Sequence, residues 1–423
     1  QEYNVSANGA TDRSSFYASM GYLSHDGITA ASDFQRFSGR LKADYQIKKW
    51  AKIGMNVSYA RFNYNTLANN GSTTSSGNIW APALQVAPVY PFYMRDGKGN
   101  IMRDANGIIR YDYGNGLNAG YSRPFISDAH PYSDATLNTY NNEGNESIGN
   151  FFADFNIIDG LTATVNGSYM LNESRYTLVY NPYYGQFDTT GGTVIKEHDR
   201  IFTYNFQQLL NYTKTFGEHN NINVLLGHEY SNDRSYSLSA EKSKMFSQDN
   251  KELSGAVLDD KGAASSKSTY NNEGYFARGM WDYDERIFAS GSFRRDASSK
   301  FHPDNRWGNF WSLGAAWRIG KESWFPQTTW LNEFKVKASY GSQGNDGISS
   351  YLYVDRFDLN NAGGEPATAF AGKGTHDITW ETNRNFNAGI EFGLWNDRIT
   401  GSIEYYRRKT TDMLFAFYVA PSM

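Results

Sequence analysis

Residues that could perform chemistry are few in this sequence and lie far apart. Cysteine is absent, which excludes disulfides, thiolate metal sites and cysteine nucleophiles. No GxSxG or HExxH motif occurs, and no nucleophile has a base placed beside it. The histidines show no metal-ligand spacing: His25, His130, His198, His219, His228, His302 and His376. The sequence therefore predicts no catalytic residue, no metal site and no cofactor, and we expect no enzyme.

Two glycine-rich segments resemble ligand-binding loops only superficially. Residues 96–100, Asp-Gly-Lys-Gly-Asn, lack the alternating acidic ligands and the final Glu of a calcium loop. Residues 341–345, Gly-Ser-Gln-Gly-Asn, follow a strand pattern and do not open an apolar helix, as a phosphate-binding loop would. We interpret both segments as turns.

Composition narrows the class of protein. The chain has 423 residues, 16% of them aromatic, with 40 glycines and 10 prolines, which suits many β-strands. The formal net charge of -4 provides no basic surface, so we expect no nucleic-acid partner. No run of 18 apolar residues occurs, but strands that span a membrane alternate and never produce such a run.

Period-two alternation dominates the sequence. In residues 161–171, Leu, Ala, Val, Gly, Tyr and Leu alternate with Thr, Thr, Asn and Ser, so one face is apolar and the other is polar. The same pattern recurs along the chain and predicts about fourteen strands. Charged residues within these strands fall on the polar face, whereas Gln208 and His228 fall on the apolar face. The members of the charged set are Lys42, Asp44, Lys52, Arg278, Asp282, Arg294, Lys335, Lys337, Glu391 and Glu404.

A soluble sandwich or propeller would also alternate, but two features favour a membrane barrel. The alternating patterns run for about 9 to 11 residues, longer than an average soluble strand. Connections alternate strictly between tight turns and long loops, as at the two ends of an outer-membrane barrel. The tight turns are 48–51, 159–160, 284–285 and 395–397, and the long loops are 65–146, 172–200, 239–268 and 342–382.

The longest of these connections, residues 65–146, is predicted to be a long extracellular loop insertion that folds over the mouth of the barrel. Residues 95–111 contain two turn signals and are predicted to form a local hairpin. Aromatic side chains at a mouth can stack on sugar rings or peptide side chains, although packing within the loop is an equal alternative. The candidate substrate-binding residues are Trp80, Tyr90, Tyr93, Tyr111 and Tyr113.

Several sequence segments become specific when they are taken together. Residues 294–301, Arg-Arg-Asp-Ala-Ser-Ser-Lys-Phe, precede Pro-Asp-Asn-Arg-Trp-Gly at 303–308 and Gly-Ala-Ala-Trp-Arg-Ile at 314–319. Further segments are Ala-Ser-Tyr-Gly at 338–341, Thr-Trp-Glu-Thr at 379–382, and Ser-Ile-Glu-Tyr-Tyr at 402–406. In this order they resemble the SusC/RagA family of TonB-dependent transporters, with Ala297 in place of the usual glycine.

The resemblance runs along the whole chain and implies an all-β fold, an antiparallel transmembrane β-barrel of 22 strands in the bacterial outer membrane. Residues 1–423 would form the barrel region, lacking the plug domain, the TonB box and the closing strands, and would stop at 420–423 where the family continues. The implied partners are TonB, acting with ExbB and ExbD through the absent N-terminal region, a SusD-like lipoprotein, and outer-membrane lipid. The transporter–lipoprotein pairs are expected to form a dimer.

The resulting hypothesis is TonB-dependent import of a large nutrient, an oligosaccharide or a peptide. The residues that would face the lumen are Arg278, Asp282, Lys335 and Glu391, whereas the apolar, aromatic-rich face of the strands would face lipid. Three alternatives stay open: an outer-membrane binding or adhesion protein, a passive porin, and a soluble β-rich carbohydrate-active enzyme. The first predicts a protein without a plug, and the second predicts ion conductance without removal of any domain.

Overall fold

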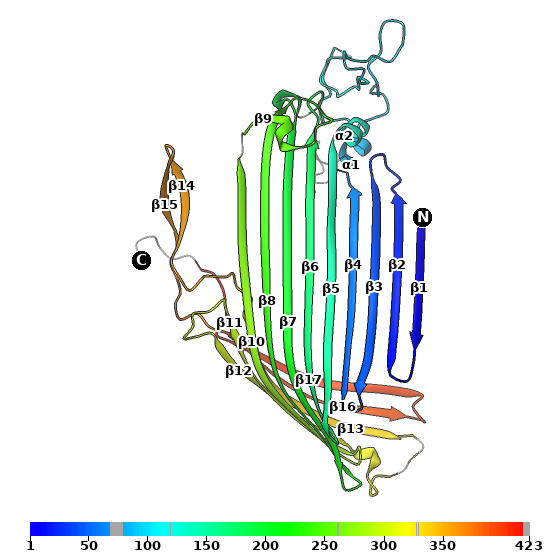
Figure 1. Ribbon diagram of the computed structural model, residues 1–423, viewed down its shortest axis with the longest axis vertical. Helices are drawn as coiled ribbons and strands as arrows, with labels where there is room; N and C mark the ends of the chain where they lie inside the picture. The colour runs from blue at the N-terminus through cyan, green and yellow to red at the C-terminus, as the bar shows by residue number, and fades with distance from the viewer. Residues whose placement is uncertain are drawn as a thin grey trace.

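The computed structural model shows one large, curved antiparallel sheet that carries loops at both edges (Figure 1). The structure describes residues 1–67, 79–118, 120–185, 187–259, 262–326, 328 and 330–417. The predicted end of the barrel region at 420–423 lies outside these residues. A small separate hairpin stands apart from the main sheet, formed by β14 (Arg356–Ala362) and β15 (Glu365–Gly372).

Fifteen strands of the described residues make up the main sheet, and each pairs with its neighbour in sequence order; only the short β9 lies off this path. The prediction of about fourteen alternating strands is thus confirmed. The strands are β1 (Glu2–Ala10), β2 (Ser14–Asp26), β3 (Asp33–Lys48), β4 (Ala51–Asn65), β5 (Thr139–Ile158), β6 (Leu161–Tyr180), β7 (Thr193–Phe216), β8 (Asn220–Met245), β9 (Ala256–Leu258), β10 (Ala263–Tyr283), β11 (Ile287–Ser298), β12 (Trp307–Arg318), β13 (Glu333–Asn345), β16 (Glu381–Leu394) and β17 (Ile399–Thr411).

Strands near the middle of the sheet are longer than the sequence predicted. β5, β6, β7, β8 and β10 have 20 to 26 residues, about twice the length needed to cross a membrane. The predicted loops 65–146, 172–200, 239–268 and 342–382 were therefore too wide, and the connections are 66–138, 181–192, 246–262 and 346–380. Residues 139–146, for example, belong to β5 but are polar on both faces, so alternation could not reveal them.

The predicted tight turns all lie at the same ends of the strands, called here the tight-turn edge; the opposite ends carry the long loops and are called the long-loop edge. At the turns 159–160, 284–286 and 395–398 the backbone adopts positive φ angles, as at Gly160 and Asp284. Strict alternation of turn length is wrong at one position, because β12 and β13 are joined by residues 319–332, which begin with a 3-10 turn, Ile319–Lys321. There Trp324 packs against Trp317, and Phe325 stacks on Phe334. Such clusters suit a membrane interface, where aromatic rings accumulate.

Two helices lie in the long connection between β4 and β5: α1 (Trp80–Gln85) and α2 (Pro131–Leu137). Between them, the predicted hairpin at 95–111 is instead a three-segment arrangement with two tight turns, at 96–99 and 104–107. Asp96 and Asp104 play equivalent roles, since each carboxylate accepts two backbone N–H groups from its own turn. A hydrogen bond from the Asn100 side-chain amide, together with these backbone bonds, holds the Asp96 pKa below its usual value. The backbone bonds confirm that 96–100 is a turn.

Apolar side chains of the sheet point outward rather than into a core. Among the described residues, the clusters of buried apolar side chains are three, all small and all at the long-loop edge. In contrast, large side chains on the apolar parity are exposed, including Val5 (73%), Met20 (67%), Leu313 (62%) and Ile403 (64%). A continuous apolar surface of this extent fits a membrane-facing wall. Within the described ranges, no helix is long and apolar enough to cross a membrane.

Candidate functional site

The main functional feature is a sheet with one polar and one apolar face. The register of the strands determines which face each side chain occupies, because residues directly opposite one another on neighbouring strands share a face. One row across six strands is polar throughout: Lys42, Asn56, Asn150, Ser168, Asn205 and Ser231. The row displaced by one residue is largely apolar: Ala7, Ala18, Leu41, Val57, Gly149, Tyr169 and Tyr204. The polar positions predicted separately for each strand therefore lie side by side on one face of the sheet, and the apolar positions lie side by side on the other.

The four residues predicted to face the lumen all lie on the polar face. Lys335 and Glu391 are opposite each other on β13 and β16, and their charged atoms are 3.1 Å apart. Asp282 accepts a hydrogen bond from Asn221 at 3.2 Å. Arg278 lies on β10 four residues before Asp282, which is two pleat repeats, and has no ion-pair partner among the described residues. That this face lines a lumen stays a prediction, which the curvature supports.

Curvature of the sheet produces a hollow of about 720 Å³, lined by residues of the main sheet from β7 to β17. Its lining is dominated by polar-parity positions, among them Asn223, Asp282, Lys337, Asn387 and Glu404. Strands β8 and β17 both line the hollow, although five strands lie between them in the sheet, β10, β11, β12, β13 and β16. The polar parity therefore occupies the concave side of the sheet.

Charged side chains on the concave face pair with one another across neighbouring strands. Lys337 lies 2.7 Å from Glu391 and 2.5 Å from Glu404. Farther along the sheet, Arg294 lies 2.5 Å from Glu229 and 2.7 Å from Asp296. Most of these side chains are partly exposed, so solvent screens their pairs, whereas Asp296 is buried. The paired side chains give the concave face fixed positive and negative charges next to one another, which can contact a polar solute or a polar protein surface.

The two polar residues predicted on the apolar face, Gln208 and His228, contact each other. Glu273 lies on the same face, and its carboxylate is 3.4 Å from His228 Nε2. His228 donates a hydrogen bond from Nδ1 to Gln208 Oε1 at 2.5 Å, across β7 and β8. The His228 ring also lies 4.6 Å from the ring of Tyr275. A paired imidazole and amide beside a tyrosine is tolerable where the membrane meets its polar boundary.

The aromatic residues predicted to bind substrate occupy different environments. Tyr111 and Tyr113 are buried, at 7% and 4% exposure, whereas Trp80 on α1 is 44% exposed. Tyr93 packs against Tyr111, and Tyr90 contacts the ring of Phe125 edge-on. The structure thus brings Tyr93 and Tyr111 together and leaves Trp80 most accessible. Substrate binding by these five residues stays a prediction, and packing within the loop accounts for the buried pair.

Residues that sequence reasoning did not single out organise this loop. His130 caps α2 by accepting the Ser133 N–H at Nδ1, while the His130 N–H binds the Asp134 carboxylate at 3.0 Å. Burial, with a contribution from Arg123, lowers the pKa of His130 to about 4, and burial raises the pKa of Asp134 to about 7. A histidine followed by Pro131 was the only local signal for this cap.

Arg123 is the second residue that organises the loop, and its side chain is buried. Its Nη2 donates to the carbonyl oxygens of Tyr113, Ile126 and Ala129 at 2.8 to 2.9 Å. Gly114 has φ +68°, and a Cβ there would collide with the Arg123 side chain. The buried arginine therefore needs a glycine beside it, and together they fix how residues 113–129 fold back.

The family-like motif residues meet at one junction at the long-loop edge. Phe301 is fully buried against Trp380, whose indole N–H donates to the Arg306 carbonyl at 2.8 Å. The Asp346 carboxylate accepts hydrogen bonds from Tyr270 and Ser298 at 2.8 and 2.7 Å. Residues of the motif segments thus connect the loop after β11 to the loop after β13.

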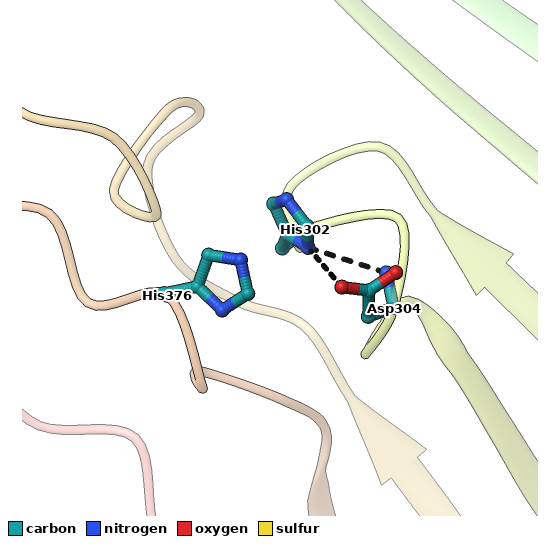
Figure 2. Close-up of side chains that lie close together, drawn as sticks. All are labelled: His302, Asp304 and His376. Carbon is teal, nitrogen blue, oxygen red and sulfur yellow. Dashed lines mark hydrogen bonds and ion pairs between the residues drawn. The ribbon is translucent and has the colours of Figure 1, made fainter.

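A further group was not visible in the sequence, because its spacing is not that of a metal motif. His302, Asp304 and His376 converge at the same junction, and their ligand atoms all lie within 4.8 Å of one another (Figure 2). His302 and Asp304 come from the loop after β11, and His376 comes from the loop after β13.

Comparison with known proteins places this geometry in context. Residues 91–423 match the family described as TonB dependent receptor-like, beta-barrel. TonB-dependent receptor P3 of Formosa agariphila is 26% identical over 96% of this chain and 39% of its own length. TonB-dependent receptor SusC of Bacteroides thetaiotaomicron is 25% identical over 98% of this chain and 41% of its own length. The chain therefore spans about two-fifths of these relatives.

Solved structures give the same fold. The RagAB peptide transporter matches with a TM-score of 0.78 and 26% identity, over 98% of this chain and 44% of that chain. The siderophore receptor PirA of Acinetobacter baumannii matches with a TM-score of 0.52 and 12% identity, over 97% of this chain and 50% of that chain, which shows the fold alone. The predicted antiparallel barrel fold and the SusC/RagA resemblance are both confirmed.

Proposed function

Because this chain belongs to the TonB-dependent receptor-like β-barrel family of outer-membrane proteins, we propose that it forms part of the wall of a nutrient importer. The transported solute is an oligosaccharide or a peptide, too large for ordinary porins. The relatives are named as receptors and transporters, so the protein acts without catalysing a reaction. The solved relative is a peptide transporter, which supports a peptide as one of the two solute classes.

The single observation that carries this proposal is the separation of the sheet into one largely polar face and one largely apolar face. The concave face is polar and bears paired charges, and the other face exposes large apolar side chains. A charge on the lipid side costs about 2 to 4 kcal/mol at the midplane, so within the membrane only the concave face can meet water. Arg278, Asp282, Lys335 and Glu391 face the lumen in this proposal, where they contact the plug domain or the solute.

The long-loop edge is the external side in this proposal, and residues 65–146 contain the extracellular insertion. Strands β5 to β8 extend beyond the apolar band and raise this edge above the membrane. A SusD-like lipoprotein closes over these loops as a lid, and TonB with ExbB and ExbD supplies energy from the periplasm. Two transporter–lipoprotein pairs form the complete assembly. Exposed Trp80 and the partly exposed Tyr90 and Tyr93 are available to a solute at the mouth.

Growth and uptake of a deletion strain test the proposal. Cells without the gene are compared with the parent on single oligosaccharides and on peptide mixtures, and uptake is measured with labelled solutes. We expect one solute class to lose uptake, and removal of TonB to have the same effect. Uptake that persists without TonB would instead indicate a passive porin. Unchanged uptake of every glycan and peptide, with loss of surface attachment, would indicate an adhesion protein.

A test of the lid uses the complete complex. The protein is solubilised in mild detergent with its neighbours and isolated through a tag on this chain. We expect a surface lipoprotein to copurify in equal amount, and shortening of the loop 66–138 to weaken that association. Isolation of the barrel alone under conditions that preserve other such complexes would contradict the lid.

A further inference from the structure

Two external loops meet at a compact group of nitrogen and oxygen ligands (Figure 2). The imidazole rings of His302 and His376 have centroids 3.7 Å apart and are tilted by 41°. His302 Nδ1 lies 3.3 Å from a carboxylate oxygen of Asp304. The side chains of His302 and His376 approach each other from different loops, so the group exists only in the folded chain.

The two loops are already joined beneath this group by hydrogen bonds. The Asn305 side-chain amide donates to the His376 carbonyl at 3.0 Å, and Thr379 Oγ1 donates to the Asn305 carbonyl at 3.0 Å. Below them, Phe301 and Trp380 are buried against each other. Backbone on both sides of the group is therefore held in place, which limits how far the ligands can separate.

We propose that His302, Asp304 and His376 bind a divalent transition-metal ion, Zn²⁺ being the model case, with water completing the coordination. Two imidazoles and one carboxylate form a donor set that suits Zn²⁺, Cu²⁺ or Ni²⁺, whereas Ca²⁺ and Mg²⁺ prefer oxygen ligands alone. Bonds of 2.0 to 2.1 Å to a tetrahedral ion put ligand atoms about 3.3 Å from one another. The observed separations, all within 4.8 Å, reach that value by small side-chain rotations.

Exposure of the group favours entry of an ion. His302 and Asp304 have side chains that are 25% and 74% exposed, so an ion from solvent reaches them and the open position holds water. Tyr353 lies edge-on to the His302 ring, with centroids 5.9 Å apart, and limits its movement on one side. Within the described ranges no other three histidine or acidic side chains converge in this way.

Another histidine of the chain provides a contrast. His219 lies 2.5 Å from Asp284 at the tight-turn edge, but this pair has no second histidine. One imidazole and one carboxylate bind a transition metal weakly, whereas a third ligand from a separate loop makes the site a chelate. The comparison provides a matched control that keeps a histidine–aspartate pair and lacks the bridge between loops.

The consequence of binding is a clamp between the loop 299–306 and residues 374–380. An ion that binds only the folded junction stabilises it by mass action, and the effect increases with the free ion concentration. The clamp is independent of the proposed transport function, because it concerns the junction of the loops and not the solute.

Direct titration tests the proposal. The complete protein is purified in detergent without a polyhistidine tag, treated with EDTA, and titrated with ZnCl₂ by calorimetry. We expect one Zn²⁺ bound through this group, with affinity reduced by more than about tenfold in His302→Ala and in His376→Ala. Asp304→Asn should weaken binding, and His219→Ala should leave it unchanged. Co²⁺ should give the absorption bands of a tetrahedral site, and CaCl₂ should give no heat from this group.

A second measurement examines the clamp itself. Hydrogen exchange of residues 299–306 and 374–380 should slow when Zn²⁺ is added, and this change should vanish in His376→Ala. Heat-modifiable mobility on electrophoresis shows that each variant barrel is folded. The proposal is overturned if Zn²⁺ does not bind saturably, if binding is the same in both histidine variants, or if exchange in the two loops is unaffected by the ion.

Discussion

The ring of Phe301, after β11, lies 5.4 Å from the ring of Trp380, which immediately precedes β16. Phe301 has no exposed surface, and Trp380 is 8% exposed. This contact closes the junction where the family-like motifs meet. It is one of the few places in the described structure where apolar side chains form a buried core rather than a membrane-facing surface.

Removal of the Phe301 ring should loosen this junction. Phe301→Ala leaves a cavity under Trp380, and such truncations cost about 3 to 5 kcal/mol. We expect faster proteolysis of the loops 299–306 and 374–380 in the folded barrel. Phe246→Ala is the control, because Phe246 is 94% exposed. Equal protease sensitivity of the two variants would show that the Phe301 contact does not support the loops.

Neighbouring leucines of β8 provide a direct test of the two faces. Leu226 lies on the apolar face and is 48% exposed, whereas Leu225 lies on the polar face opposite Arg278. Leu226→Arg should cost about 2 to 4 kcal/mol in the membrane and reduce the amount of assembled barrel. Leu225→Arg should assemble nearly normally. The amounts of heat-modifiable protein in outer-membrane fractions measure both variants, and the reverse order would mean that the faces are assigned wrongly.

Substitution of two glycines in tight turns distinguishes the cost of a strained backbone from the cost of a steric clash. Gly160 and Gly217 both have positive φ angles, +78° and +61°. A Cβ at Gly160 would strike the Thr213 carbonyl oxygen, but a Cβ at Gly217 meets nothing within 4 Å. Gly160→Ala should therefore destabilise the barrel more than Gly217→Ala, which bears only the conformational cost of about 1 kcal/mol. Unfolding midpoints in detergent test this order, and equal midpoints would contradict it.

Stability of the loop that contains α2 should depend on pH through two buried groups with opposite effects. Asp134 has a pKa raised from 3.8 to about 7, so the folded loop keeps a proton that the unfolded loop releases. Stability from this group falls as pH rises between those values. His130 has a pKa lowered from 6.5 to about 4, so its contribution rises with pH across that window.

The two slopes offset each other between about pH 4 and 6.5 in the parent. Asp134→Asn removes the falling contribution, and stability of the loop should then increase with pH over this window. Hydrogen exchange of residues 123–137, corrected for the intrinsic rate at each pH, measures the effect. The exposed Asp128 provides the control variant, Asp128→Asn, which should behave like the parent. An Asp134→Asn profile as flat as the parent's would contradict the opposing roles.

Much of the sheet could be predicted from the sequence, and the reason is local. A strand that meets lipid on one side and water on the other must alternate, so residues 161–171 alone indicate both a strand and its two faces. The parts of β5 to β8 beyond the apolar band meet water on both sides, and no alternation marks them. The sequence for that reason predicts a loop at residues 139–146, which the structure shows to be part of β5.

The arrangement of the loops was beyond the sequence for a different reason. Tyr111 and Tyr113 looked accessible as loop aromatics, yet packing with Phe92, His130 and Ser133 buries them. Burial of a side chain depends on what covers it, and the covering residues come from elsewhere in the chain. Likewise, the sequence gives no metal-ligand spacing for His302 and His376, because they lie in different loops that only the fold brings together.

The sequence by itself determined which faces of the strands are polar and apolar, where the tight turns fall, and which family the chain resembles, because each depends on neighbouring residues and their period. Only the tertiary structure decided the length of the strands outside the membrane, the charge pairs across the concave face, the buried junction at Phe301 and Trp380, and the group of three metal ligands. These depend on strand register and on contacts between distant loops, which no local pattern of residue types specifies.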